Sequence, residues 1–185
     1  MTLPNFITIA RLIAVPLIVW LMIADRFAEA TVVFVLAGIS DAADGFIANR
    51  FGASSELGAY LDPIADKALL VSVFVTLGMK GALPPWLIVL VVSRDLFIIG
   101  GMLLAYVLSN PMPVRPLLVS KVNTTAQIVL IAFVLVDRAD LVTLGWPIEA
   151  TVLTVAALTV VSAGAYLVEW VRHMAGEPHE EEGGS

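Results

Sequence analysis

The chain has 185 residues, of which 59% are hydrophobic, and its mean hydropathy is +0.96. Soluble globular domains use roughly 45–50% apolar residues, so this composition excludes an ordinary soluble enzyme and indicates an integral membrane protein. A chain of this length forms about one domain, and we expect one transmembrane domain over residues 1–174. The net charge of −6 comes largely from residues 175–185, an acidic tail that we expect to be disordered. We expect no nucleic-acid partner.

Apolar segments long enough to cross a hydrocarbon core of about 30 Å, which takes about 20 residues, occur throughout the chain. They lie at residues 7–24, 29–48, 58–79, 85–108, 119–136 and 147–171. They are apolar on all sides, whereas soluble helices alternate polar and apolar faces. The segments between them combine charge with Gly, Pro, Asn or Ser, as turns do. The sequence therefore predicts an all-α integral membrane protein, a bundle of six transmembrane helices.

Basic residues indicate how this bundle is oriented. Cytoplasmic loops of membrane proteins carry an excess of Lys and Arg. The side with more of them has Arg50, Arg115, Lys121 and Arg172, and the opposite side has Arg26, Lys80 and Arg138. We therefore expect both termini in the cytoplasm.

Four aspartates lie between Ser40 and Lys67, inside this apolar chain. Asp41 and Asp44 are three residues apart on one expected helix, and Asp62 and Asp66 are four apart on the next. Both spacings put side chains on one helical face. The short connection "NRFGASSE" makes the two helices antiparallel neighbours, so we expect the carboxylates to converge near the cytoplasmic membrane surface. A carboxylate at the centre of a bilayer costs about 2.5–3.5 kcal/mol, so such residues indicate function.

A divalent metal would relieve the repulsion between these carboxylates. Oxygen ligands without His or Cys suit Mg²⁺, Mn²⁺ or Ca²⁺, and four of them could hold two ions about 4 Å apart, an arrangement used in phosphoryl transfer. Gly45 and Gly58 lie beside the acidic pairs and suggest that a phosphate or nucleotide comes close to the backbone. A cation-coupled transporter with carboxylates along its pathway is the alternative. We find no internal repeat, which many transporters carry.

The pattern Asp41-x-x-Asp44-Gly45-x-x-Ala48, followed by Gly58-x-x-x-Asp62-x-x-x-Asp66, resembles the signature of the CDP-alcohol phosphotransferases, membrane enzymes of six helices. The resemblance covers nearly the whole chain, since "LPNFITIARLIAVP", "SRDLFIIG" and "SKVNTTAQIVLI" are similar to the first, fourth and fifth helices of the family. It implies a transfer from a CDP-linked donor to an alcohol, with release of CMP.

The resemblance also implies roles for the aspartates. Asp41, Asp44 and Asp62 become ligands of divalent metal, which we expect to be two Mg²⁺ or Mn²⁺ ions. Asp66 becomes a ligand and the catalytic base on the acceptor hydroxyl.

The nucleotide pocket implied by the resemblance is lined by Gly45, Ala48 and Gly58. The family usually has Arg after this Ala, whereas here Asn49 stands there and Arg50 follows. We expect Arg50 to make the nucleotide contact from one residue further along.

Two branches of the family fit the chain, and both use CDP-diacylglycerol. Phosphatidylglycerol-phosphate synthases take glycerol 3-phosphate as acceptor, and their fourth helix usually has Arg-Glu followed by another Arg. Here Arg94 is followed by Asp95, and no basic residue follows from Leu96 to Leu108. We therefore expect a cardiolipin synthase using phosphatidylglycerol, in a bacterial inner membrane with the site facing the cytoplasm. Phosphatidylglycerol-phosphate synthase is the alternative, and a homodimer stays open.

Two basic residues are further binding candidates. Arg94 is expected to contact lipid phosphate or else to form an interhelical ion pair. Because Arg94 and Asp95 are adjacent, we expect that they do not face each other and that each has its own partner. Lys121 is expected either to bind the phosphodiester of the acceptor or to extend to the membrane interface.

Overall fold

The computed structural model describes the backbone of residues 3–51, 56–107 and 118–174, and the side chains of residues 10–40, 65–101 and 118–172. The helices of these stretches are α1 (Leu3–Ile23), α2 (Phe27–Phe51), α3 (Glu56–Met79), α4 (Pro85–Val107), α5 (Leu118–Arg138) and α6 (Gly145–Met174). Each lies on one of the apolar segments expected from the sequence, and the ends agree within a few residues. The predicted positions of the six helices are confirmed. The proposed tail, residues 175–185, lies outside the described residues.

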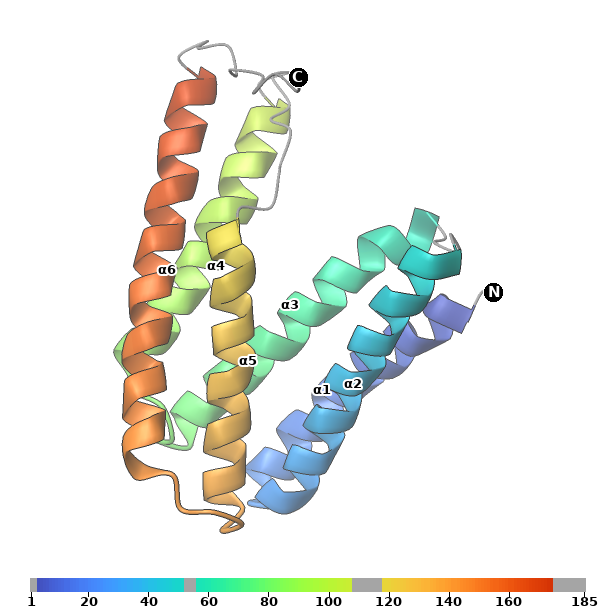
Figure 1. Ribbon diagram of the computed structural model, residues 1–185, viewed down its shortest axis with the longest axis vertical. Helices are drawn as coiled ribbons and strands as arrows, with labels where there is room; N and C mark the ends of the chain where they lie inside the picture. The colour runs from blue at the N-terminus through green and yellow to red at the C-terminus, as the bar shows by residue number, and fades with distance from the viewer. Residues whose placement is uncertain (1–2, 52–55, 108–117, 175–185) are drawn as a thin grey trace.

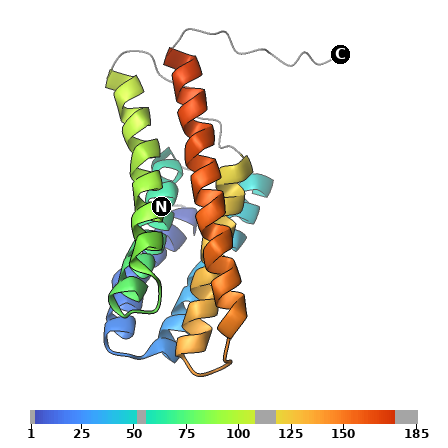
Figure 2. The same ribbon diagram turned by 90° about the vertical axis from the view of Figure 1, so that its left-hand side faces the viewer.

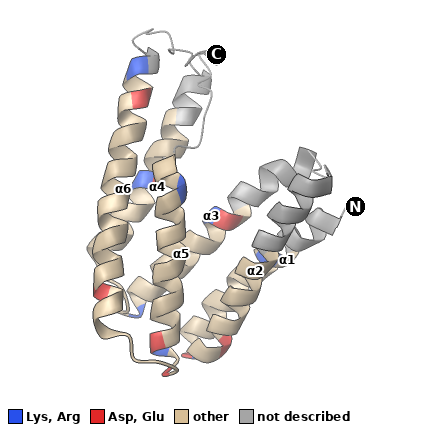
Figure 3. Cartoon of the chain, in the orientation of Figure 1, with Lys and Arg blue, Asp and Glu red and all other residues tan. Residues whose placement is uncertain are grey.

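Within the described part of the chain, two helices are long and apolar enough to cross a membrane, namely Leu118–Arg138 and Gly145–Arg172. Shorter apolar helical stretches are Ala10–Ile23 and Phe27–Ser40. Figure 3 shows that the described parts of the helices consist mostly of uncharged residues, with charged residues near the ends and a few between. These features are consistent with a membrane protein, and the crossing of all six helices stays a prediction.

The helices form two groups (Figures 1 and 2). In the first, α1 packs against both α2 and α3, and in the second, α6 packs against both α4 and α5. Helix α5 joins the groups by packing on α2 and α3, and α3 also packs on α4. Figure 1 shows the groups close together at the end where α1 turns into α2 and diverging toward the end that holds the N-terminus.

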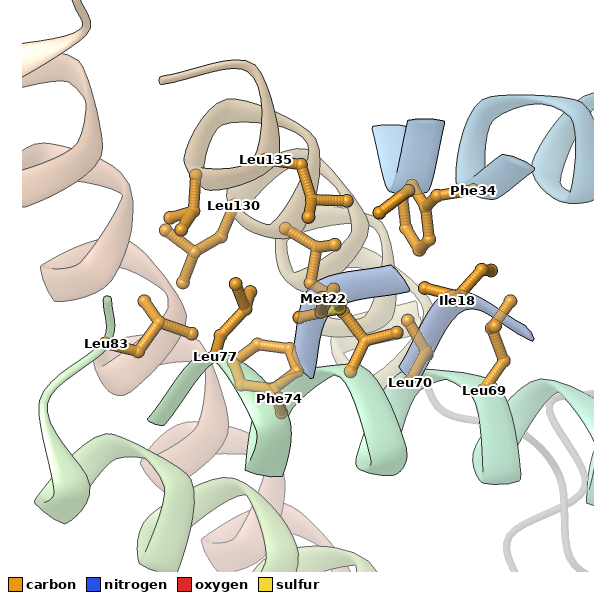
Figure 4. Close-up of a cluster of buried hydrophobic side chains, with 14 of the residues drawn as sticks. Ile18, Met22, Phe34, Leu69, Leu70, Phe74, Leu77, Leu83, Leu130 and Leu135 are labelled. Carbon is orange, nitrogen blue, oxygen red and sulfur yellow. The ribbon is translucent and has the colours of Figure 1, made fainter. Parts of the chain in front are cut away.

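The apolar core lies where the two groups meet. Figure 4 shows Ile18 and Met22 of α1 among side chains from α3 and α5, with Phe34 of α2 beside them. Phe74 of α3 and Leu130 of α5 are fully buried in this cluster. Close-packed interiors tolerate few voids. The buried side chains of this cluster therefore fix the relative positions of the helices.

Three short turns close one end of the molecule, which we name the turn end. Each has a residue with positive φ just after a helix: Asp25 after α1, Gly81 after α3 and Asp140 after α5. In each turn the next amide donates back to a carbonyl near the helix end, for example Ala82 N to Leu77 O at 2.8 Å. This arrangement is a common helix C-cap, and Gly81 adopts it without a side-chain penalty. The turn chemistry expected in these connections is confirmed.

Polar side chains follow the apolar core on the side away from the turn end. This polar layer consists of Arg11, Asp66, Lys67, Arg94, Asp95, Ser120, Asn123, Gln127, Thr159 and Ser162. Most of its members are buried.

Part of the polar layer lies between α5 and α6. Thr159 donates to Asn123 Oδ1 at 3.1 Å. Asn123 Nδ2 and both polar atoms of the Gln127 amide have no hydrogen-bond partner in the described part of the chain. Both side chains are nevertheless fully buried.

Candidate functional site

The four aspartates lie on two helices that are consecutive in the chain. Asp41 and Asp44 are in the second half of α2, and Asp62 and Asp66 are in the first half of α3. The helical backbone gives the two pairs the spacing of a shared face, as predicted. Figure 1 shows the C-terminal end of α2 and the N-terminal end of α3 at the same end of the molecule.

Several predicted site residues have side chains that lie outside the described residues, so their convergence stays a prediction. They are Asp41, Asp44, Gly45, Ala48, Asn49, Arg50, Gly58 and Asp62.

Helix α1 contributes to the packing here in a way that the sequence did not suggest. We expected α2 and α3 to be direct neighbours because their connection is short. Over the described residues, α1 packs on each of them, whereas α2 and α3 do not pack on each other. Helix α1 therefore supports both α2 and α3 over the described residues.

Arg11 of α1 is paired with Asp66, and sequence reasoning missed it. Arg11 Nη1 donates to Asp66 Oδ1 at 2.5 Å. The Arg11 side chain is only 2% exposed, while that of Asp66 is 42% exposed. A buried guanidinium needs a counter-charge, so an arginine inside an apolar helix should have signalled a carboxylate partner on a neighbouring helix.

This pairing does not exclude the predicted roles of Asp66. An ionised carboxylate accepts hydrogen bonds or metal ions at both oxygens, so a bond from Arg11 to Oδ1 is compatible with a second interaction.

Arg94 and Asp95 do face each other, contrary to our expectation. Arg94 Nη1 donates to Asp95 Oδ1 at 2.6 Å. The argument from adjacency was wrong because the long, flexible Arg side chain can fold back toward the carboxylate of the next residue. Both residues are buried in the polar layer.

The remaining nitrogens of Arg94 join three helices. Nε and Nη2 donate to Ser162 Oγ of α6 at 3.2 and 2.7 Å, and Nη2 also donates to Ser120 Oγ of α5 at 2.5 Å. The ring of Tyr166 lies 5.7 Å from the guanidinium carbon. These contacts favour the interhelical alternative for Arg94. The partner residues Ser120, Ser162 and Tyr166 gave no signal in the sequence, since Ser and Tyr are common in such helices.

Lys67 completes this network from α3. Its ammonium donates to both carboxylate oxygens of Asp95, each at 2.7 Å. Asp95 thus has two cationic partners, Lys67 and Arg94. Lys121, by contrast, lies exposed in the first turn of α5.

The donor chemistry of the acidic residues fits a divalent metal. Among the described side chains no group of three or more potential ligands occurs, and only Asp66 of the four aspartates belongs to that set. Asp66 is a hard oxygen donor, partly exposed and located on the helix that carries Asp62. Carboxylate oxygens are the ligands that Mg²⁺ and Mn²⁺ prefer, so the residues present are suited to these ions.

Curated relatives have names that point to one area of lipid chemistry. A rice (Oryza sativa subsp. japonica) CDP-diacylglycerol–glycerol-3-phosphate 3-phosphatidyltransferase is 35% identical over 154 residues, covering 74% of this chain and 47% of the rice protein. The human cardiolipin synthase (CMP-forming) is 33% identical over 147 residues, covering 71% of this chain and 49% of the human protein. A cardiolipin synthase (CMP-forming) of Streptomyces coelicolor is 38% identical over 101 residues, covering 51% of this chain and 47% of the Streptomyces protein.

The chain spans about half the length of these relatives. The sequence model of one protein family, described as CDP-alcohol phosphatidyltransferase, matches residues 1–171 of the chain. This match includes all six helices except the last residues of α6. The resemblance inferred from the aspartate pattern is confirmed, and the chain belongs to the CDP-alcohol phosphatidyltransferase family.

Proposed function

We propose that this protein is a membrane-embedded phosphatidyltransferase. It moves a phosphatidyl group from CDP-diacylglycerol to an alcohol acceptor and releases CMP. The observation that carries the proposal is the acidic pattern on α2 and α3, in a chain matched to the family over residues 1–171. The names of the relatives support the same class of reaction, because they include CMP-forming synthases and a CDP-diacylglycerol-dependent transferase.

In the proposed site, Asp41, Asp44, Asp62 and Asp66 hold divalent metal, two Mg²⁺ or Mn²⁺ ions. When bound, the metal neutralises the pyrophosphate and stabilises CMP as the leaving group. Gly45, Ala48 and Gly58 line the nucleotide pocket, and Arg50 binds the donor. Glycine and alanine suit this task because their small side chains let a phosphate approach the backbone.

Asp66 is the proposed base. The acceptor hydroxyl gives its proton to the Asp66 carboxylate as its oxygen attacks the phosphorus that bears the diacylglycerol. The bond from that phosphorus to the CMP oxygen breaks, and CMP leaves. Arg11 holds the Asp66 carboxylate in position through the 2.5 Å hydrogen bond.

For the acceptor, we propose phosphatidylglycerol, which makes the product cardiolipin. Support comes from Asp95 after Arg94, where glycerol-phosphate enzymes usually have Glu, and from the absence of basic residues between Leu96 and Leu108. Relatives of both branches match the chain, so glycerol 3-phosphate is the second candidate. Lys121 is a proposed contact to the acceptor phosphodiester.

We also propose that all six helices cross a bacterial inner membrane with the site facing the cytoplasm. The excess of basic residues on that side supports this orientation. Exposed apolar side chains such as Phe97 and Leu153 would then contact lipid or a second copy of the chain.

The test is an acceptor screen. Purified protein in lipid nanodiscs receives CDP-diacylglycerol, Mg²⁺ or Mn²⁺, and either phosphatidylglycerol or glycerol 3-phosphate, and CMP release and lipid products are measured by mass spectrometry. We expect cardiolipin from phosphatidylglycerol. Asp44→Asn should release no CMP, whereas Asp140→Asn, which alters an exposed turn residue, should behave as the unmodified protein. Absence of CMP release with both acceptors would refute the proposal.

A further inference from the structure

The network around Asp95 has one more positive charge than negative charge. Lys67 and Arg94 both donate to the single carboxylate of Asp95. The other partners of Arg94 among the described residues are the uncharged Ser120 and Ser162 hydroxyls and the Tyr166 ring. Two cations and one anion leave a net charge of +1 on these three residues, in a layer where charges are poorly screened. Such a group attracts an anion.

The excess charge is accessible at Lys67. The side chains of Arg94 and Asp95 are 3% and 7% exposed, whereas that of Lys67 is 36% exposed. An ammonium has three N–H donors, and two bonds go to the Asp95 oxygens. Within the described residues the third donor makes no further bond, so it can serve a ligand, while the buried pair beneath holds the ammonium in place.

Lys67 and Asp66 are consecutive residues that extend toward different neighbours. Asp66 bonds to Arg11 of α1, and Lys67 bonds to Asp95 of α4. The ammonium thus lies beside the proposed base, but on the side of α4 rather than on that of α1. A donor pyrophosphate held by metal at the aspartates would leave this side to the acceptor.

We propose that Lys67 binds the phosphate of the acceptor alcohol and that Asp95, held by Arg94, positions the Lys67 ammonium. This inference rests on the proposed phosphatidyl transfer. The ligand is a phosphate monoester if the acceptor is glycerol 3-phosphate and a phosphodiester if it is phosphatidylglycerol. Lysine binds either one as a point charge, without the bidentate geometry of arginine.

The test replaces Lys67 by Gln. The variant should fold, because it leaves Arg94 and Asp95 as a neutral pair. The KM for the acceptor should rise roughly ten- to a hundredfold, as expected for the loss of one charge-assisted hydrogen bond, while the KM for CDP-diacylglycerol stays the same. Lys67→Arg, which keeps the charge, should recover part of the affinity. Lys80→Gln is the matched control, because Lys80 directly follows the last residue of α3, Met79, and pairs with Asp25 at 2.6 Å.

A second measurement needs no turnover. Glycerol 3-phosphate, or nanodiscs containing phosphatidylglycerol in place of phosphatidylcholine, should raise the thermal unfolding temperature of the unmodified protein, and Lys67→Gln should lose this shift. The ligand that gives the shift identifies the monoester or the diester.

Other outcomes would overturn the assignment. A rise in the KM for CDP-diacylglycerol instead would assign Lys67 to the donor, and an unchanged KM with lower stability would leave it a purely structural role. If Lys67→Gln does not fold, the absence of any ligand-induced shift in the unfolding temperature of the unmodified protein would also refute it. Failure of the unmodified protein to release CMP refutes the proposed function separately, because the ligand-binding measurement stands without turnover.

Discussion

Two buried arginines in this protein form similar ion pairs in different surroundings. Arg11 and Arg94 are 2% and 3% exposed, and each donates to an aspartate. The partner of Arg11, Asp66, is 42% exposed, whereas the partner of Arg94, Asp95, is 7% exposed and also bonded to Lys67. The first carboxylate is thus accessible to substrate and water, and the second is buried and paired with two cationic side chains.

The difference separates a site from a structural clamp. A buried ion pair is weak evidence for stability by itself, but removing one member leaves an uncompensated buried charge. At Arg94 each nitrogen has a bond to another helix or to Asp95, so the pair fixes helix packing. At Arg11 the accessible carboxylate can take part in chemistry. The following predictions test this division.

Removal of divalent metal should have the largest effect. It should affect the proposed chemistry at Asp66 and not the helix packing around Arg94. Excess EDTA should abolish CMP release, because the clustered carboxylates need a divalent counter-ion to bind the donor. Far-UV circular dichroism should show that the helices remain. EDTA already saturated with Mg²⁺ is the control and should leave activity intact. Full turnover in excess EDTA would contradict the metal assignment.

Asp66→Asn should have the next largest effect. Loss of a general base typically lowers the rate by about 10²–10⁴-fold, so kcat should fall by this factor. Because Asp66 is partly exposed, water can replace some of its interaction with Arg11, and the protein should stay folded. Stopped assays of CMP release would measure the rate, and binding of CDP-diacylglycerol should survive better than turnover. Equal losses of binding and turnover would make Asp66 mainly a metal ligand.

Asp95→Asn should lower the stability of the folded protein. It removes the only carboxylate bonded to Arg94 and Lys67 within the described residues, and breaking a buried pair in this way costs about 3–5 kcal/mol. Thermal or denaturant unfolding in detergent would measure this loss. Asp25→Asn is the matched control, since Asp25 also pairs with a lysine, Lys80, but is 72% exposed. That change should cost at most about 1 kcal/mol. Similar losses in both variants would show that the network is not a clamp.

The helices were predictable from the sequence, and their packing was not. Long apolar segments separated by turn residues determine where helices begin and end, because a lipid environment requires backbone hydrogen bonds to close within each segment. Which helices touch depends on side-chain shape along their whole length. The short connection between α2 and α3 therefore gave no indication that α1 packs on both.

The candidate site divides in the same way. The aspartates could be recognised because carboxylates in an apolar chain are costly and their spacing follows the helical period. Arg11 carried a similar signal, but its partner could be identified only from the three-dimensional contact with Asp66. The contact between Arg94 and Asp95 depends on how a flexible side chain folds back, and rules on residue spacing do not describe such a rotamer.

Two polar residues of α5, Asn123 and Gln127, have a consequence for how the chain enters a membrane. The amides of Asn123 and Gln127 are buried only because neighbouring helices cover them, and α6 supplies the Thr159 hydroxyl to one of them. A solitary α5 would expose both amides to hydrocarbon, at a cost of several kcal/mol each. The turn before α6 is short, and Leu144 N donates to Asp137 Oδ1 at 2.7 Å across it. Helices α5 and α6 are therefore suited to leave the translocation machinery together, as a preassembled hairpin.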